Sequence, residues 1–139
     1  MGEIFLAGRI LVGGFYLLSA FHHFAELGPM ARYADSLGVP LPELAVAVTG
    51  ILLAIAGLTL ILGIYPDLGI AALVLFFVPV TFIMHAFWAD RDATMRQMDI
   101  ANFGKNVALL GSSLMFAAVP RPWAYSLERR AYLPVKVPV

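Results

Sequence analysis

The stretch ELAVAVTGILLAIAGLTLIL, residues 43–62, decides the fold. After its first residue it holds no charged side chain, and it is long enough to cross a bilayer core, which takes about 20 mostly apolar residues in a helix. Ala47, Gly50, Ala54 and Gly57 recur in it at steps of three or four. Small residues at this spacing let two helix backbones approach closely in a membrane. We therefore predict a transmembrane helix that packs tightly against a second one.

Apolar runs of similar length lie on both sides of this stretch, at residues 4–24, 68–88 and 97–119. Four such runs with short connections occupy most of the chain, which leaves no room for a separate soluble module. The prediction is an all-α fold, a four-transmembrane-helix bundle that forms a single membrane domain over residues 1–139, with a C-terminal tail from residue 120.

A polar interruption separates the first two runs, from Pro29 to Pro42. Within it, Met30, Tyr33 and Ala34 fall on one helical face together with Leu37. This pattern predicts a short helix that lies in the membrane interface between spans one and two. A plain re-entrant loop is the alternative.

The composition agrees with a lipid environment and excludes several functions. Of the 139 residues, 61% are hydrophobic and 13% are charged, whereas soluble domains carry about 25% charged residues. Nine basic residues balance nine acidic ones, so there is no footprint for nucleic acid. Cysteine is absent, which excludes thiolate chemistry and cysteine-bound iron–sulfur centres.

The basic residues predict the orientation of the spans. One side of a four-span bundle would hold both termini, with four basic residues in the tail, and the other side would hold Arg32, Arg91 and Arg96. The positive-inside rule then favours cytoplasmic termini in a multi-pass inner membrane protein that contacts lipid. Arg9, about one turn inside the membrane, is expected to extend its guanidinium to the headgroups.

Polar residues at membrane depth are candidates for function because burying them is costly. Three spans bring such residues to one leaflet, opposite the cytoplasm, and together they form the candidate cluster: His22, His23, Glu26, His85, Trp88, Asp99, Asn102, Lys105 and Asn106. Each of them also has a purely structural interpretation, as a packing or hydrogen-bonding residue. We predict that Asn102 and Asn106 bond to a neighbouring span, and that Lys105 points inward and pairs with Glu26 or Asp99.

The chemistry of this cluster is compatible with a quinone site more than with a metal or haem. No His-x3-His pair stands on one helix, so the sequence predicts no metal site and does not single out a catalytic residue. A quinone needs an apolar slot, an aromatic wall, donors for its carbonyl oxygens and an ionisable group to pass protons. His85, Trp88, Lys105 and Asn106 match these requirements.

The chain resembles the DoxX family of small four-helix membrane proteins. The resemblance spans about residues 5–118 and rests on four stretches in fixed order, residues 8–13, 36–40, 85–88 and 97–111. Many members carry a glycine and a lysine near the end of the first span, where this chain has Ala20 and the pair His22 and His23. A role assigned to that lysine therefore does not transfer.

The resemblance implies a membrane subunit linked to redox chemistry, because the family is named after a subunit associated with a thiosulfate:quinone oxidoreductase. The leading expectation is a non-catalytic accessory subunit of a membrane electron-transfer complex, whose partners are other membrane protein subunits. The apolar, proline-containing tail after residue 131 is expected to lie against such a partner. The alternative is a small oxidoreductase subunit with its own quinone site in the outer leaflet.

Overall fold

The computed structural model describes residues 1–128, and it contains helices but no strand over that range. The expected contact of the tail after residue 131 lies outside the described residues. The prediction of an all-α fold is confirmed by five helices: α1 (Gly2–Ala25), α2 (Leu27–Ser36), α3 (Pro42–Leu62), α4 (Pro66–Met84) and α5 (Ala93–Ala117). The run at 68–88 was predicted to be helical to its end, but α4 stops at Met84; α5 begins four residues before the predicted position 97.

Three helices, α1, α3 and α4, are long and apolar enough to cross a membrane. The outer faces of α1 and α3 expose large apolar side chains such as Leu11, Leu18, Ile51 and Leu58. Soluble monomers rarely expose contiguous apolar surface on this scale, so these faces fit contact with lipid. Helix α5 is the longest of the five helices, but it is less apolar than the other three and does not qualify as a membrane span by length and composition. Four spans are therefore not confirmed.

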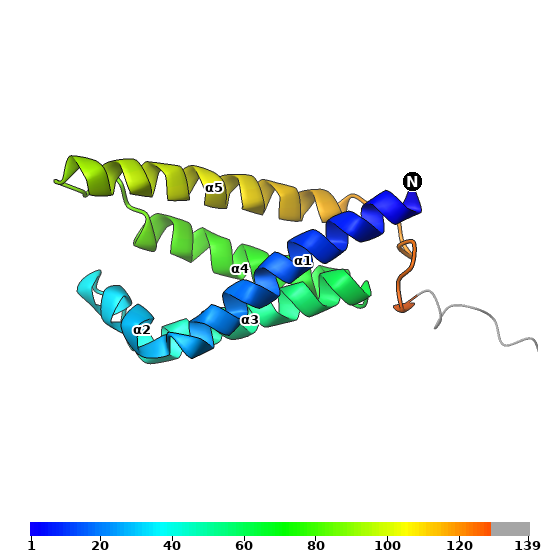
Figure 1. The fold of residues 1–139 in the computed structure, drawn as a ribbon, viewed down its shortest axis with the longest axis horizontal. Helices are drawn as coiled ribbons and strands as arrows, with labels where there is room; N and C mark the ends of the chain where they lie inside the picture. The colour runs from blue at the N-terminus through cyan, green and yellow to red at the C-terminus, as the bar shows by residue number, and fades with distance from the viewer. Residues whose placement is uncertain (129–139) are drawn as a thin grey trace, which may run out of the picture.

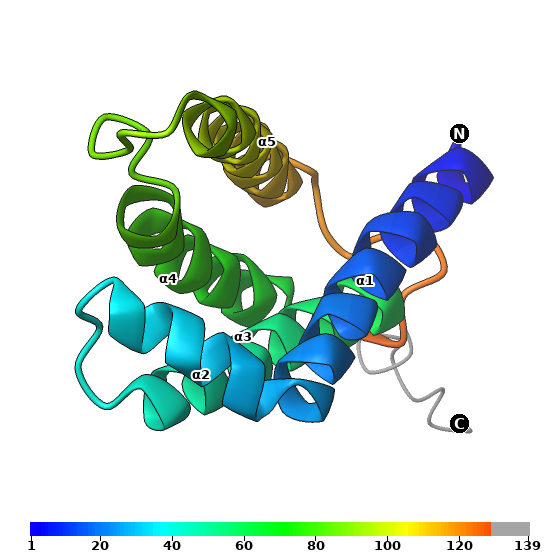
Figure 2. The ribbon, with the colours of Figure 1, turned by 60° about the vertical axis from the view of Figure 1, so that its left-hand side comes forward.

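The helices follow one another around an open arc (Figures 1 and 2). Helix α1 packs along α3, α3 packs on α4, and α4 packs on α5, while α2 folds back onto α3. The core of this arrangement includes Tyr16, Leu53, Leu60 and Phe77, all nearly inaccessible to solvent. The short helix predicted between the first two spans is confirmed as α2, which begins at Leu27 and buries Ala34 against its neighbours.

Helices α1 and α3 cross closely at a point where two glycines face each other. A Cβ atom added to Gly57 would lie 2.8 Å from the carbonyl oxygen of Gly13 and 2.7 Å from Leu17 Cγ. Gly50 is also buried in α3, and a Cβ atom added there would lie 3.0 Å from His23 Cβ in α1. The predicted close approach of α3 to another helix is therefore confirmed at these two positions.

Arg9 does not reach headgroups, and the expectation that it would is wrong. The side chain is fully buried, and its guanidinium donates to three main-chain carbonyl oxygens: Leu60 at 2.8 Å, Ile61 at 2.7 Å and Ala124 at 2.7 Å. Leu60 and Ile61 lie in the last turn of α3, where carbonyls lack helical partners and a cation is favoured by the helix dipole. Arg9 therefore closes the end of α3 and holds the segment after α5.

Gly63 is required next to this guanidinium for two reasons. It ends α3 with a positive φ of 65°, and its amide donates to the Thr59 carbonyl at 2.8 Å. A Cβ atom there would also lie 2.6 Å from Arg9 Nη2. Only glycine satisfies both the left-handed backbone and the approach of the arginine.

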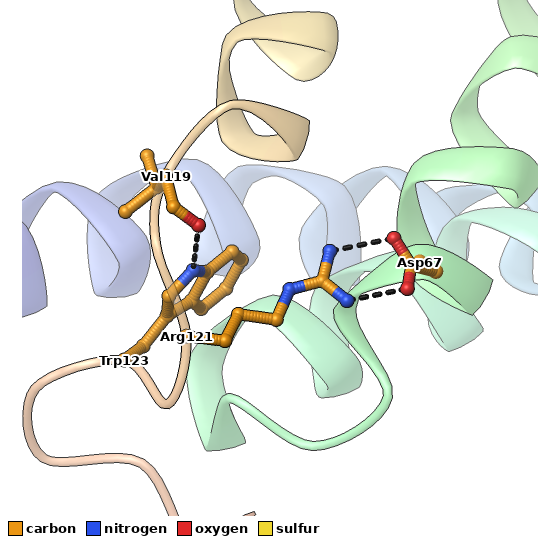
Figure 3. A network of polar contacts seen from close by, with 4 residues as sticks. All are labelled: Asp67, Val119, Arg121 and Trp123. Carbon is orange, nitrogen blue, oxygen red and sulfur yellow. Dashed lines mark hydrogen bonds and ion pairs between the residues drawn. The ribbon is translucent and has the colours of Figure 1, made fainter.

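The segment after α5 turns back across the ends of α1, α3 and α4 (Figure 1). Trp123 is 1% exposed, and its ring packs against Phe5 and lies 5.3 Å from the Arg9 guanidinium carbon. Figure 3 shows the indole N–H donating to the Val119 carbonyl, while Arg121 forms a two-pronged ion pair with Asp67 at the start of α4. The exposed ion pair contributes little, so the buried Arg9 and Trp123 anchor this segment.

Candidate functional site

A cavity of about 690 Å³ lies among the five helices. Its walls are mainly apolar and aromatic, including Leu52, Leu53, Phe76 and Phe77. Small-molecule sites typically have this size and consist of apolar walls with a few polar groups. The polar members of the lining come from α1, α2, α3 and α5 and from the residue after α4: Tyr16, Ser19, His23, Tyr33, Thr49, His85, Lys105 and Asn106.

The cavity is lined by residues of both α1 and α5, which are not packed along each other. The two helices contact each other toward the C-terminal end of α5 (Figure 1). There the Tyr16 hydroxyl lies 3.3 Å from Ser113 Oγ, and the rings of Phe5 and Phe116 are 6.0 Å apart.

His85 lines the cavity and is bound by a carboxylate. It directly follows α4, where the backbone leaves the helical region. Its Nδ1 lies 3.0 Å from Oδ1 of Asp99 in α5, and both side chains are largely buried, at 19% and 13% exposure. A carboxylate at this distance orients the ring and fixes which nitrogen carries its proton. No hydrogen bond to Nε2 is found among residues 1–128, so this nitrogen remains for a molecule in the cavity.

Further acidic and phenolic groups surround this pair. Asp90 lies in the loop before α5, and its Oδ2 is buried without a hydrogen-bond partner in the described residues. Burial, followed by the charge of nearby Asp99, raises the pKa of Asp90. Burial also raises the pKa of Tyr33 in α2, and the charges of Asp99 and Asp90 act in the same direction. The polar end of the cavity is therefore electronegative on the side of the 85–92 loop.

This arrangement predicts that Asp90→Asn makes the protein more resistant to heat at neutral pH. A raised folded-state pKa means that the native protein binds the Asp90 proton more tightly than the unfolded chain, so stability is lost as pH rises above the ordinary aspartate range. The variant avoids this loss. Its midpoint of thermal unfolding in detergent should exceed that of the wild type at pH 7, and the difference should shrink on acidification toward pH 4. A difference that grows on acidification would contradict the sign.

Lys105 and Asn102 do not form the predicted contacts. Lys105 is exposed rather than turned inward, and its ammonium donates to Asn102 Oδ1 at 3.1 Å, one turn earlier on the same helix. Asp99, one of its two expected partners, is held by His85 instead. Asn106 is buried at 5% exposure and lines the cavity, but the predicted hydrogen bond to a neighbouring helix is not found among residues 1–128.

Three further members of the predicted cluster, His22, Glu26 and Trp88, do not line the cavity. His22 is exposed and stands beside Phe21, and Glu26 is exposed where α1 ends. Trp88 is 56% exposed and packs with Phe82, Phe87 and Phe103 in an aromatic group between α4 and α5. Of the histidine pair, His23 does line the cavity, with Nδ1 held 2.8 Å from the Ser19 carbonyl.

Sequence reasoning missed Tyr33 and Asp90 as site residues. Tyr33 stands on the face of the interfacial helix that was predicted to be apolar, which signals contact with the bundle but not with a cavity. Asp90 was not singled out in the sequence. Among residues 1–128, no three His, Asp or Glu side chains are placed to hold a metal ion.

Comparisons with known proteins place the chain among membrane proteins. The family model described as DoxX matches residues 4–86. The inner membrane protein YphA of Escherichia coli (strain K12) is 29% identical over 128 residues, which cover 91% of this chain and 89% of that protein. No solved structure matches the chain.

Proposed function

Since this chain belongs to the DoxX family of integral membrane proteins, we propose that it is a quinone-binding subunit of a membrane electron-transfer complex. The observation that carries the proposal is the cavity, whose apolar walls end in a buried asparagine and a carboxylate-bound histidine. An accessory subunit without a ligand needs no such cavity. The geometry therefore favours the quinone site over the purely structural role that the family resemblance first suggested.

The proposal includes α5 as the fourth span. Its 25 residues give a length of roughly 37 Å at 1.5 Å per residue, against a hydrocarbon core of about 30 Å. Two of its polar residues, Asp99 and Asn106, are buried inside the protein, and Lys105 lines the cavity. With cytoplasmic termini, as the basic residues favour, the polar end of the cavity faces the outer leaflet.

The polar groups fit a quinone head in number and in kind. A benzoquinone ring carries two carbonyl oxygens that accept hydrogen bonds, and Asn106 and Lys105 on adjacent positions of α5 both carry donors. Phe76 and Phe77 supply aromatic surface on the facing wall.

A direct binding measurement tests the proposal. In the wild-type protein reconstituted in lipid nanodiscs, a short-chain benzoquinone analogue should bind saturably. Asn106→Leu keeps the side-chain volume but removes the amide, so affinity should fall about tenfold, the equivalent of one lost hydrogen bond of about 1.4 kcal/mol. Ser112→Ala is the matched control on α5, because Ser112 bonds to the Leu109 carbonyl and does not line the cavity.

Two outcomes would contradict the proposal. The first is an absence of saturable binding in the wild-type protein, which would return the accessory role to first place. The second is equal affinity of Asn106→Leu and Ser112→Ala, which would place the bound quinone elsewhere on the protein.

A further inference from the structure

The two ring nitrogens of His85 have different surroundings. Nδ1 is engaged by Asp99, while Nε2 has no protein partner in the described part of the chain and belongs to a residue that lines the cavity. On the premise that the cavity holds a quinone, we propose that the protonation state of the His85–Asp99 pair determines how strongly the site prefers the quinol over the quinone. His85 would contact the bound head group, and Asp99 would be a positioning residue.

The preference follows from counting donors and acceptors. In the neutral imidazole, the Nδ1 proton is donated to Asp99, and Nε2 offers only a lone pair. A quinol hydroxyl can donate to that lone pair, but a quinone carbonyl is itself an acceptor and is repelled. When the ring takes up a proton, Nε2–H donates to the carbonyl, and the quinol hydroxyl also remains acceptable through its oxygen. The neutral pair therefore discriminates against the quinone, and the protonated pair does not.

The charged and titratable groups that face His85 come from several neighbouring elements. From α5 these are Asp99, Arg96 and Lys105, from the loop Asp90 and Asp92, from α2 Tyr33, and from α1 His23. Asp92 is occupied as the N-cap of α5, where it accepts from the Met95 amide at 2.8 Å. Of these groups, only His85 and His23 are histidines that line the cavity, and histidine is the side chain that ordinarily changes charge between about pH 5 and 8.

His23 therefore provides the matched control. Its Nδ1 is held by the Ser19 carbonyl of its own helix, with no carboxylate bound to the ring. His23→Gln removes one cavity histidine and leaves the His85–Asp99 pair intact. His85→Gln removes the titrating ring but keeps an amide that both donates and accepts, so it can meet either form of the ligand at any pH.

The experiment measures the affinities of a short-chain benzoquinone and its quinol, under anaerobic conditions, in nanodiscs across pH values from about 5 to 8. In the wild type, the ratio of quinol affinity to quinone affinity should rise with pH, by up to about tenfold per unit because one proton is linked. The ratio should be constant in His85→Gln and should keep the wild-type slope in His23→Gln. In Asp99→Asn, the slope should weaken, because a neutral amide no longer fixes the ring proton on Nδ1 and the lone pair on Nε2.

The outcomes separate the inference from the function on which it rests. A constant ratio in the wild type, a retained slope in His85→Gln, or a slope lost in His23→Gln would overturn the inference while quinone binding stands. Failure of both ligand forms to bind at every pH would overturn the proposed function itself. If His85→Gln fails to fold, the slope in Asp99→Asn decides the question, since a purely structural role of Asp99 would leave the wild-type slope in place.

Discussion

Arg9→Met should lower the free energy of unfolding by at least about 3 kcal/mol, because hydrogen bonds to a charged group contribute about 1.5–3 kcal/mol each and three are lost. Methionine fills much of the buried volume but leaves the carbonyls of Leu60, Ile61 and Ala124 without their donor. The ring faces of Phe5 and Trp123 also lose the cation that lies over them. Unfolding in mixed detergent micelles, followed by tryptophan fluorescence, measures the effect.

Arg9→Lys should fall between the wild type and Arg9→Met, since one ammonium cannot reach three carbonyls with the geometry of a guanidinium fork. Arg32→Met is the matched control, because Arg32 is exposed on α2 and its replacement should change stability by less than about 0.5 kcal/mol. Similar losses in Arg9→Met and Arg32→Met would show that the buried hydrogen bonds do not hold the bundle together.

Gly57→Ala should cost about 1–3 kcal/mol by forcing α1 and α3 apart. The added methyl group would lie 2.8 Å from the Gly13 carbonyl oxygen, a main-chain atom that cannot turn aside. Gly14→Ala is the control, because a Cβ atom there meets nothing within 4 Å and alanine is the better helix former by up to about 1 kcal/mol. The two variants should therefore shift the unfolding midpoint in opposite directions, and a shared direction would contradict the proposed crossing.

The sequence predicted those parts of the fold that depend on local pattern. Helices α1 and α3 lie within two residues of their predicted bounds, because an uninterrupted apolar run has no alternative in lipid but a helix. The end of α4 was placed four residues too late, since Phe87 and Trp88 continue the apolar run. In the structure they leave the helix and pack around Phe103, a contact that hydropathy cannot distinguish from a helical turn.

The contacts of the site were predicted less well, for a reason that Arg9 and Lys105 illustrate. Both are basic residues inside a predicted span, and from sequence alone each could face lipid, headgroups or protein. Their partners differ in sequence separation: Asn102 lies three residues from Lys105, whereas Ala124 lies 115 residues from Arg9. The proximity of His85, Asp99 and Asn106 could be predicted, because successive spans run in opposite directions and the end of one therefore lies at the same depth as the start of the next.

The Arg9 contacts also have a consequence for how the protein is made. Its carbonyl partners at Leu60 and Ile61 are synthesised long after Arg9 itself, and the partner at Ala124 comes later still. While the chain is being synthesised from its N-terminus, the guanidinium of the first span enters the membrane before any of these carbonyls has left the ribosome. The first helix therefore completes its hydrogen bonding only when nearly the whole chain has emerged, which makes stable insertion of its start dependent on the arrival of its end.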